Sequence, residues 1–235
     1  MNCKRLIALL MTPLLMMGGA SVAESSEQMW TVGFSAREIL PDMTRLENGE
    51  YYMAGYQSGY PAKGMLDPQY VRAVWLDAGD GLGGIVLAAI DCVAISSVDV
   101  NIIRDRLADF MAETGCRFVH ICATHTHAGI DTMGLWGPVG VSGQDADFMQ
   151  TLYEQTETAV REAYKSRKQG RLYYGTAEMP GYLFRDSREP EVIDPTLSCL
   201  RFAPSDGTRG LRIYHRSGRY KQTQRRPQQR HKGAA

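Results

Sequence analysis

The chain has 235 residues, of which 44% are hydrophobic and 22% are charged, and its 26 basic and 26 acidic residues cancel to a formal net charge of zero. The charges are unevenly distributed, because residues 216–235 carry seven Lys or Arg and no acid, and two more basic residues lie near the N-terminus. The rest of the chain has 17 basic and 26 acidic residues, which gives it a net charge of −9. This is the wrong sign for a nucleic-acid-binding surface, so we expect no nucleic-acid partner.

The first 23 residues are typical of a secretory signal peptide. Lys4 and Arg5 form a basic start, residues 6–17 are almost all apolar, and residues 21–23 (Ser-Val-Ala) supply the small side chains that a signal peptidase needs. The apolar run is short for a membrane span, and a retained N-terminal anchor is the alternative. We therefore expect an exported chain, secreted or periplasmic.

The next part of the chain predicts strands separated by a long loop. Residues 29–35 indicate a short strand, and a Gly- and Tyr-rich loop follows over residues 51–64. Loops of this length are usually binding loops or lids, and a packed surface loop with aromatic anchors is the alternative. Residues 70–76 and 84–90 are predicted strands, joined by a hairpin turn at 77–81.

The strand at 84–90 is almost wholly apolar, which indicates burial on both faces. It ends at Asp91, in the position where α/β folds bind their ligands. Asp91 is therefore a candidate catalytic residue, and hydrogen bonding to the following turn is the alternative. A helix capped by Ser96 or Ser97 is predicted to run to about Glu113.

The third predicted strand, residues 117–123, leads into two histidines. Strand, helix and strand in this order predict a βαβ crossover, so Asp91 and His125 should meet at one edge of the sheet. Because side chains alternate in an extended segment, His125 and His127 should leave the backbone on the same side. Such a pair can hold one metal ion, or one metal ion and one substrate group. A pair held only by local hydrogen bonds is the alternative, and His120 is predicted to be structural.

The remaining residues predict a second amphipathic helix from about 145 to 168 and strands at 172–175 and 197–202. The buried seam of this helix is predicted to comprise Phe148, Leu152, Thr156, Ala159 and Ala163. We therefore expect an α/β fold with a mixed β-sheet core and flanking helices. Cys92 and Cys122 lie in apolar strands, where cysteine usually acts as a small buried hydrophobe, and one disulfide is left open.

Seven short segments occur in a distinctive order between about residues 30 and 213. They are Trp30–Ser35 (WTVGFS), Met53–Tyr56 (MAGY), Asp67–Ala73 (DPQYVRA), Ala89–Val93 (AIDCV), Ala123–Gly129 (ATHTHAG), Ile193–Pro195 (IDP) and Leu200–Phe202 (LRF). Each segment is short, but in this order they resemble the N-terminal catalytic domain of the neutral/alkaline (non-lysosomal) ceramidases. The segment with the two histidines carries most of the resemblance.

The resemblance implies an amide hydrolase that uses one zinc ion and acts on N-acyl sphingoid lipids of the ceramide class, with transient contact with a membrane surface. By analogy, His125 is a zinc ligand, and His127 positions the substrate or the attacking water. Asp91 is the other predicted catalytic residue. The family's further ligands, a second His, a Glu and a Tyr, lie downstream. His215 lacks the following Pro of that second His, so we expect the zinc site to be incomplete in this chain and the chain to be inactive as given.

The predicted organisation is a signal peptide at 1–23, a partial ceramidase-like domain at 24–213 and a basic tail at 214–235. The tail is expected to be disordered or to result from a frameshift near residue 213, and a genuine tail that binds anionic lipid headgroups is the alternative. Two other functions stay open. One is an exported binding or scaffold protein without catalysis, and the other is a hydrolase of the same fold with another amide or ester substrate.

Overall fold

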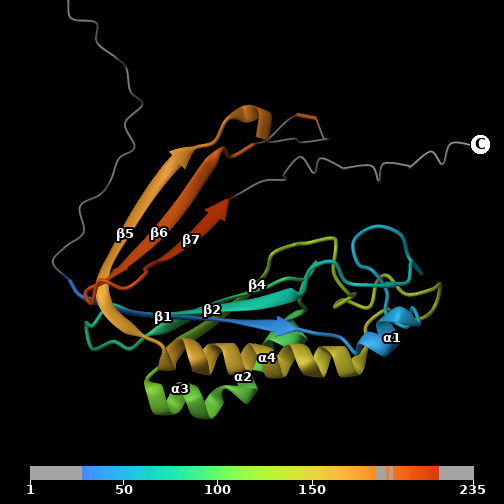
Figure 1. The fold of residues 1–235 in the computed structure, drawn as a ribbon, viewed down its shortest axis with the longest axis horizontal. Coiled ribbons are helices and arrows are strands. Elements are labelled where there is room, and N and C mark those ends of the chain that lie inside the picture. Colours follow the sequence, from blue (N-terminus) through green and yellow to red (C-terminus); the bar gives the residue numbers. More distant parts are fainter. Residues whose placement is uncertain (1–27, 184–188, 191–192, 217–235) are drawn as a thin grey trace, which may run out of the picture. The chain divides into compact units, whose positions relative to one another are not determined.

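The structure, a computed structural model, describes residues 28–183, 189–190 and 193–216 (Figure 1). The predicted signal peptide and residues 217–235 of the predicted tail lie outside these ranges. The strands are β1 (Trp30–Ile39), β2 (Gln69–Asp77), β3 (Ile85–Ile90), β4 (Phe118–Ala123), β5 (Lys168–Glu178), β6 (Thr196–Pro204) and β7 (Leu211–Arg216). The helices are α1 (Met43–Glu47), α2 (Ser97–Arg106), α3 (Ala108–Thr114), α4 (Ala146–Lys165) and the short 3-10 turn η1 (Gly181–Leu183).

The described strands form a mixed sheet in the order β4-β3-β2-β1-β5-β6-β7, so the predicted α/β class is confirmed. The chain divides into two compact units. The described part of the larger unit covers residues 28–173 and 200–213 and contains β1–β4 and α1–α4. The described part of the smaller unit covers residues 174–183, 189–190, 193–199 and 214–216, which include the second part of β5, η1, the first part of β6 and the end of β7.

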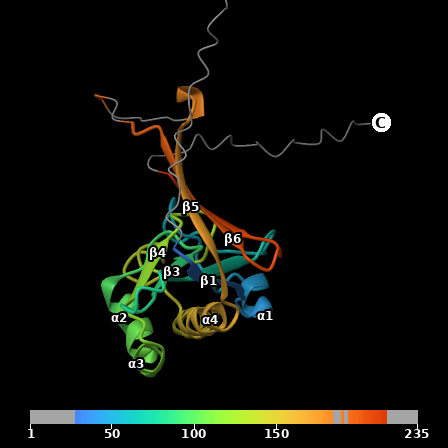
Figure 2. The same cartoon turned by 90° about the vertical axis from the view of Figure 1, so that its left-hand side faces the viewer.

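In the larger unit, β2 pairs with β1 and with β3 in antiparallel fashion, which confirms the hairpin predicted between β2 and β3. The pairing of β3 with β4 is parallel, as a βαβ unit with α2 and α3 in the crossover requires. Figures 1 and 2 show α2, α3 and α4 on the same side of β1–β4. The main core lies between these two layers and includes Trp75, Val86 and Leu152.

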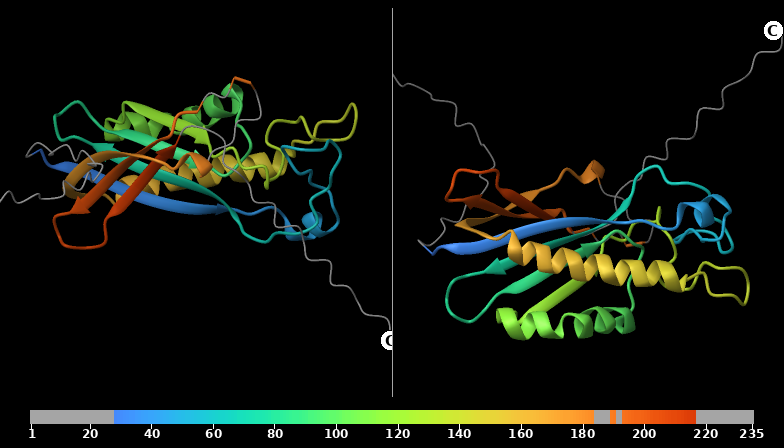
Figure 3. Two further views of the ribbon diagram at one scale, coloured as in Figure 1. Left: turned by 90° about the horizontal axis from the view of Figure 1, so that it is seen from above. Right: turned by 60° about the horizontal axis from the view of Figure 1, so that its bottom comes forward.

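Helix α4 packs directly on the backbone of β1, and Figure 3 shows the two running side by side. The helix begins after Asp145, whose carboxylate accepts a hydrogen bond from the Phe148 N–H. The seam predicted from its periodicity is buried, as expected. A Cβ atom at Gly33 of β1 would lie only 1.9 Å from the carbonyl oxygen of Ala163. Only glycine therefore allows this close approach of strand and helix.

Three sequence predictions in this unit are wrong in detail. Burial of β3 on both faces is one of them: Val86, Ala88 and Ile90 are buried, whereas the alternate residues Ile85, Leu87 and Ala89 are exposed or half-buried, because the helices cover only one face of the sheet. The helix expected over residues 96–113 is divided into α2 and α3 at Leu107, which leaves the helical backbone region (φ −100°, ψ 6°) while its side chain is completely buried. Cys122 is exposed, whereas Cys92 is buried as predicted. The reason is that the helices cover only one face of β4, where Val119 and Ile121 lie, and Cys122 alternates to the other face.

The four cysteines in the described ranges are free, so the disulfide left open by the sequence is not formed among them. Gly115 ends α3 with a left-handed backbone (φ 68°), as its position after the predicted helix indicated. Within the part of the chain that the structure describes, no helix is both long and apolar enough to cross a membrane.

The contact between β1 and α4 predicts that Gly33→Ala destabilises the protein by about 1–3 kcal/mol, because the added methyl group would meet backbone atoms that cannot move separately. The free energy of unfolding in denaturant measures the effect. Gly175→Ala in β5 is the matched control, since a Cβ there meets nothing within 4 Å, and we expect it to stay within about 0.5 kcal/mol of the parent. Equal effects of both variants would contradict the proposed contact.

Candidate metal centre

The histidine pair follows β4 directly, at the end of the sheet where β3 also ends. Ile90 of β3 pairs with Ala123 of β4, and the N–H of Thr124 donates to the Ile90 carbonyl at 2.9 Å. His125 then adopts a left-handed backbone with φ of 60°, which is rare for residues other than glycine. The segment is therefore not extended at His125, and the two rings meet through this bend rather than through a strand period of two.

The ring of His125 is oriented by the main chain behind it. Its Nδ1 atom lies 2.6 Å from the carbonyl oxygen of Val93, which follows β3. Because a carbonyl oxygen can only accept, Nδ1 carries a proton, and in the neutral ring Nε2 then presents a lone pair. That Nε2 atom lies 3.3 Å from Nε2 of His127. Since two facing lone pairs repel, either a proton on one of the two rings or a metal cation must lie between the two nitrogens.

This geometry fits a metal ion. Two nitrogen ligands of a tetrahedral zinc ion, each about 2.0–2.1 Å from the metal, lie about 3.3–3.4 Å apart. Metal-bound histidines also usually donate their second ring N–H to a carbonyl or carboxylate, as His125 does to Val93. In the described ranges, however, no group of three or more His, Cys, Asp or Glu side chains could hold a metal ion. The described residues therefore supply at most two nitrogen ligands.

His127 is fixed by the Gly- and Tyr-rich loop, which lies against the histidine pair as the binding-loop interpretation predicts. Its ring and the Tyr56 ring meet in a T-shaped contact, with ring centroids 5.0 Å apart. Gly55 has φ of 104°, and a Cβ atom there would lie 2.5 Å from Cγ and Nδ1 of His127. The N–H of Ala54 donates to the carbonyl of Gly129 at 3.0 Å, which joins this loop to the segment after the pair.

Asp91 lies at the same sheet edge as His125, as predicted, and its carboxylate is fully engaged. Oδ2 accepts from the Tyr70 N–H at 3.1 Å and from Nη1 of Arg72 at 2.7 Å. Oδ1 accepts from the hydroxyl of Thr124 at 3.2 Å. The carboxylate thus connects β2 to the residue immediately before His125.

Gln69 is a residue of this region that the sequence analysis missed. Its amide Nε2 donates to the Asp91 carbonyl at 2.5 Å, and its Oε1 accepts from the Ile130 N–H at 3.2 Å. A Cβ atom at Gly129 would lie 2.5 Å from the same amide nitrogen. Gln69 therefore joins the end of β3 to the segment after the histidines. Its position inside a motif was the only signal, and glutamine at the start of a strand has no predictive pattern of its own.

Asp131 was also missed, although it is completely buried. Its Oδ1 atom accepts from the N–H groups of Met133 and Gly134 at 2.8 and 2.9 Å, and its Oδ2 atom accepts from the Trp136 N–H at 2.7 Å. An aspartate followed by glycine three residues later is the local signal for such a turn. These bonds determine the path of the glycine-rich loop that follows the histidine pair.

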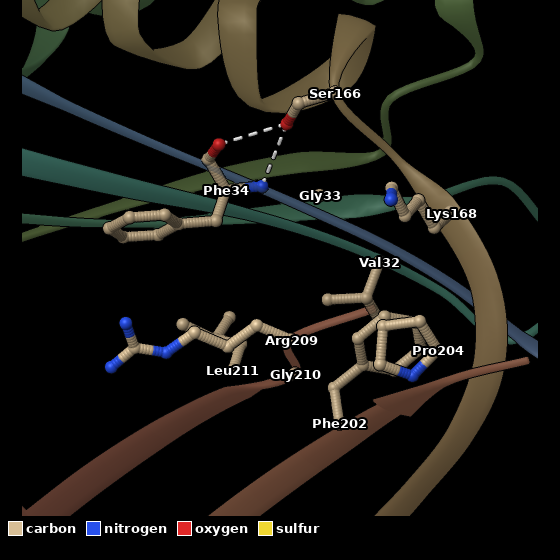
Figure 4. A pocket seen from close by; sticks show the side chains of 10 residues that line it. All are labelled: Val32, Gly33, Phe34, Ser166, Lys168, Phe202, Pro204, Arg209, Gly210 and Leu211. Carbon is tan, nitrogen blue, oxygen red and sulfur yellow. Dashed lines mark hydrogen bonds between the residues drawn. The ribbon is translucent and has the colours of Figure 1, made fainter. Parts of the chain in front are cut away.

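A separate groove of about 450 Å³ lies along the first half of β1 (Figure 4). Phe34 and Arg209 border it, and Ser166 at the end of α4 binds the Phe34 main chain through its hydroxyl. Lys168, at its rim, is held by Asp206 and by Thr208, each at 2.9 Å. None of the predicted site residues lines this groove, so it is separate from the candidate metal centre.

No protein-family model and no curated protein matches the sequence. Among solved structures, one described as a ceramidase complexed with C2 is similar with a TM-score of 0.64 and 20% identity, covering 77% of this chain and 30% of that chain. A neutral ceramidase from Pseudomonas aeruginosa is similar with a TM-score of 0.62 and 20% identity, covering 78% of this chain and 31% of that chain.

The chain has a ceramidase fold. The resemblance seen in the sequence is thus confirmed at the level of the structure, over more than three quarters of the chain. The chain spans about 30% of the length of these ceramidases. At 20% identity the comparison establishes the fold, and the activity of the whole ceramidases is considered for this chain only as a proposal below.

The contact with Val93 predicts which nitrogen of His125 carries the proton. In metal-free protein, nitrogen NMR of labelled histidine should show the Nδ1–H tautomer, because the Val93 carbonyl can accept this proton and cannot donate one. The exposed His120 of β4 is the reference within the same protein, since no such carbonyl constrains it in the described contacts. Finding the Nε2–H tautomer at His125 would contradict the orientation described here.

Proposed function

We propose that this chain is a ceramidase-like hydrolase that cleaves N-acyl amide bonds of sphingoid lipids with the help of one zinc ion bound by His125. The observation that carries the proposal is the 3.3 Å separation of the His125 and His127 Nε2 atoms at the end of β4 in a ceramidase fold. The substrate class follows from the ceramidases that share the fold, one of which is described as complexed with C2.

The roles of the two histidines follow from their surroundings. His125, with its Nδ1 proton donated to Val93, offers an Nε2 lone pair as a ligand. Bound zinc would act there as a Lewis acid that polarises the amide carbonyl. His127 is held in place by Gly55 and Tyr56 and can hold a proton on Nε2, which lets it orient a water molecule or the substrate carbonyl by hydrogen bonding.

We propose that Asp91 positions His125 in the same site. Its carboxylate accepts three hydrogen bonds from the protein, which leaves few of its lone pairs free to contact a substrate. By holding the Thr124 hydroxyl, it constrains the residue just before the left-handed bend at His125. Asp91 would therefore influence catalysis by positioning His125, without contacting the substrate itself.

Zinc binding tests the metal part of the proposal. His125→Ala should weaken zinc affinity about 10-fold or more, because it removes a nitrogen ligand. Competition with a chelating dye measures this affinity. His120→Ala is the matched control, since His120 is an exposed histidine five residues earlier that lies in β4, and it should leave the affinity unchanged. Equal zinc affinity of the parent and both variants would refute the assignment of His125.

Hydrolysis of a short-chain N-acylsphingosine tests the substrate. Product release by the zinc-loaded parent, lost in His125→Ala and reduced in His127→Ala by more than the zinc affinity, would show that the two histidines suffice. Zinc well below one ion per chain, with no product, would instead agree with the incomplete and inactive site expected from the sequence. Zinc binding without hydrolysis of any amide or ester would favour the non-catalytic binding protein. Cleavage of other amides or esters, with N-acylsphingosine untouched, would favour a different hydrolase of the same fold.

We also propose that the chain is exported, because residues 1–23 have the basic start, apolar stretch and small residues of a signal peptide. Expression in a secreting bacterial host, followed by mass spectrometry of the extracted protein, checks this. The expected product begins at Glu24. A product in the cytoplasm that retains residues 1–23 would contradict export.

A further inference from the structure

Two loops flank the histidine pair, and we call residues 51–67 and 129–143 the site loops. They are joined to each other by main-chain contacts: Met53 forms a bridge with Ile130, and the Gly59 N–H donates to the Trp136 carbonyl at 2.8 Å. Figures 1 and 3 show them at the same end of the larger unit, as the cyan and the yellow-green segments. The two loops thus form one continuous border beside His127.

The site loops expose an unusual number of large apolar side chains. Single exposed apolar residues are common on soluble proteins, but here they are concentrated on two adjoining segments. Leu66 and Val139 are fully exposed, so neither side chain packs on the protein. The exposed side chains of the site loops are Tyr56, Tyr60, Met65, Leu66, Leu135, Val139 and Val141.

The site loops carry almost no exposed charge. Lys63 and Asp67 are the exposed charged residues of the two segments, and they have opposite signs. Asp131 is buried and accepts three main-chain N–H groups, so it presents no charge to a partner. In contrast, the chain between residues 24 and 215 has a net charge of −9. The site loops are therefore an apolar, nearly neutral surface on an acidic protein.

An apolar cavity lies between the end of the first site loop and the segment that follows His127. It has a volume of about 270 Å³, and Met65 and Leu66, near the end of the first site loop, line it. Its other wall includes Ala128 and Gly129, which directly follow His127. An alkyl chain that enters beside Leu66 would thus reach the segment that holds His127.

We propose that the site loops insert into the interfacial layer of a lipid surface and place the histidine pair at that surface. Moving the fully exposed Leu66 and Val139 side chains out of water lowers the free energy, and Tyr56 and Tyr60 combine an apolar ring with a hydroxyl that suits the headgroup level. The choice of a lipid surface over a protein partner rests on the proposed function, because an N-acyl sphingoid substrate resides in a bilayer.

Tryptophan placed in the loops tests the insertion directly. Leu66→Trp and Val139→Trp are measured in the full chain with vesicles of phosphatidylcholine that carries bromine on its acyl chains, which quenches indole fluorescence on contact. Leu82→Trp is the matched control, because Leu82 is also exposed but lies in the turn between β2 and β3, at the far end of β3 from Asp91. Zwitterionic lipid minimises attraction of the basic residues 216–235.

We expect several-fold stronger quenching for the two loop variants than for Leu82→Trp. Quenching requires contact between the indole and the brominated acyl chains, so binding of the protein to vesicles through another segment would not quench the loop indoles. Absence of quenching at both loop positions would overturn the proposal, even if the chain sediments with the vesicles. Equal quenching at all three positions would also overturn it. Burial of the loop indoles with rising protein concentration, without lipid, would assign the surface to a second copy instead.

The vesicles contain no amide lipid, which separates this proposal from the proposed function. Insertion without hydrolysis of N-acylsphingosine would support the lipid-binding surface and refute the enzymatic assignment. Hydrolysis of a water-soluble short-chain substrate, without quenching of the indole fluorescence at Leu66→Trp and Val139→Trp, would support the enzymatic assignment and refute the lipid-binding surface.

Discussion

The parallel pairing of β3 with β4 determines the geometry of the candidate site. It brings Ile90 beside Ala123, so the residues that follow the two strands emerge side by side. The Val93 carbonyl then lies within hydrogen-bond distance of the His125 ring, and the Asp91 carboxylate within reach of Thr124. A shift of one residue in this pairing would move His125 to the other face of the sheet and away from Val93.

The second constraint on the site is that the backbone passes very close to two of its side chains, which is possible only at glycine residues. Gly55 leaves room for the His127 ring, and Gly129 leaves room for the Gln69 amide. Both glycines lie in the loops that meet at the Ala54–Gly129 hydrogen bond, so the orientation of His127 depends on two segments more than 70 positions apart. The same two loops carry the apolar side chains at the border of the site. The orientation of His127 and the surface proposed to meet lipid are therefore parts of one structural unit.

Much of the fold follows from local patterns. Strand β3, the hairpin before it, the buried seam of α4 and the left-handed end at Gly115 were all predicted, because each depends on neighbouring residues along the chain. Three predictions failed because they depend on the surrounding elements. The apolar composition of β3 could not show that only one of its faces is buried. Periodicity could not show that the helix divides at the buried Leu107. The apolar composition of β4 could not show that helices cover only one of its faces, which leaves Cys122 exposed.

For the site, the sequence by itself determined which residues are candidates and that Asp91 and His125 meet at one sheet edge, because a strand–helix–strand order constrains where strand ends lie. Only the tertiary structure decided how they meet. The left-handed backbone of His125, the proton on its Nδ1 and the 3.3 Å between the Nε2 atoms depend on Val93, Gly55 and Gln69, which are distant in sequence. Such contacts leave no periodic trace in the chain, because each joins single residues from separate elements.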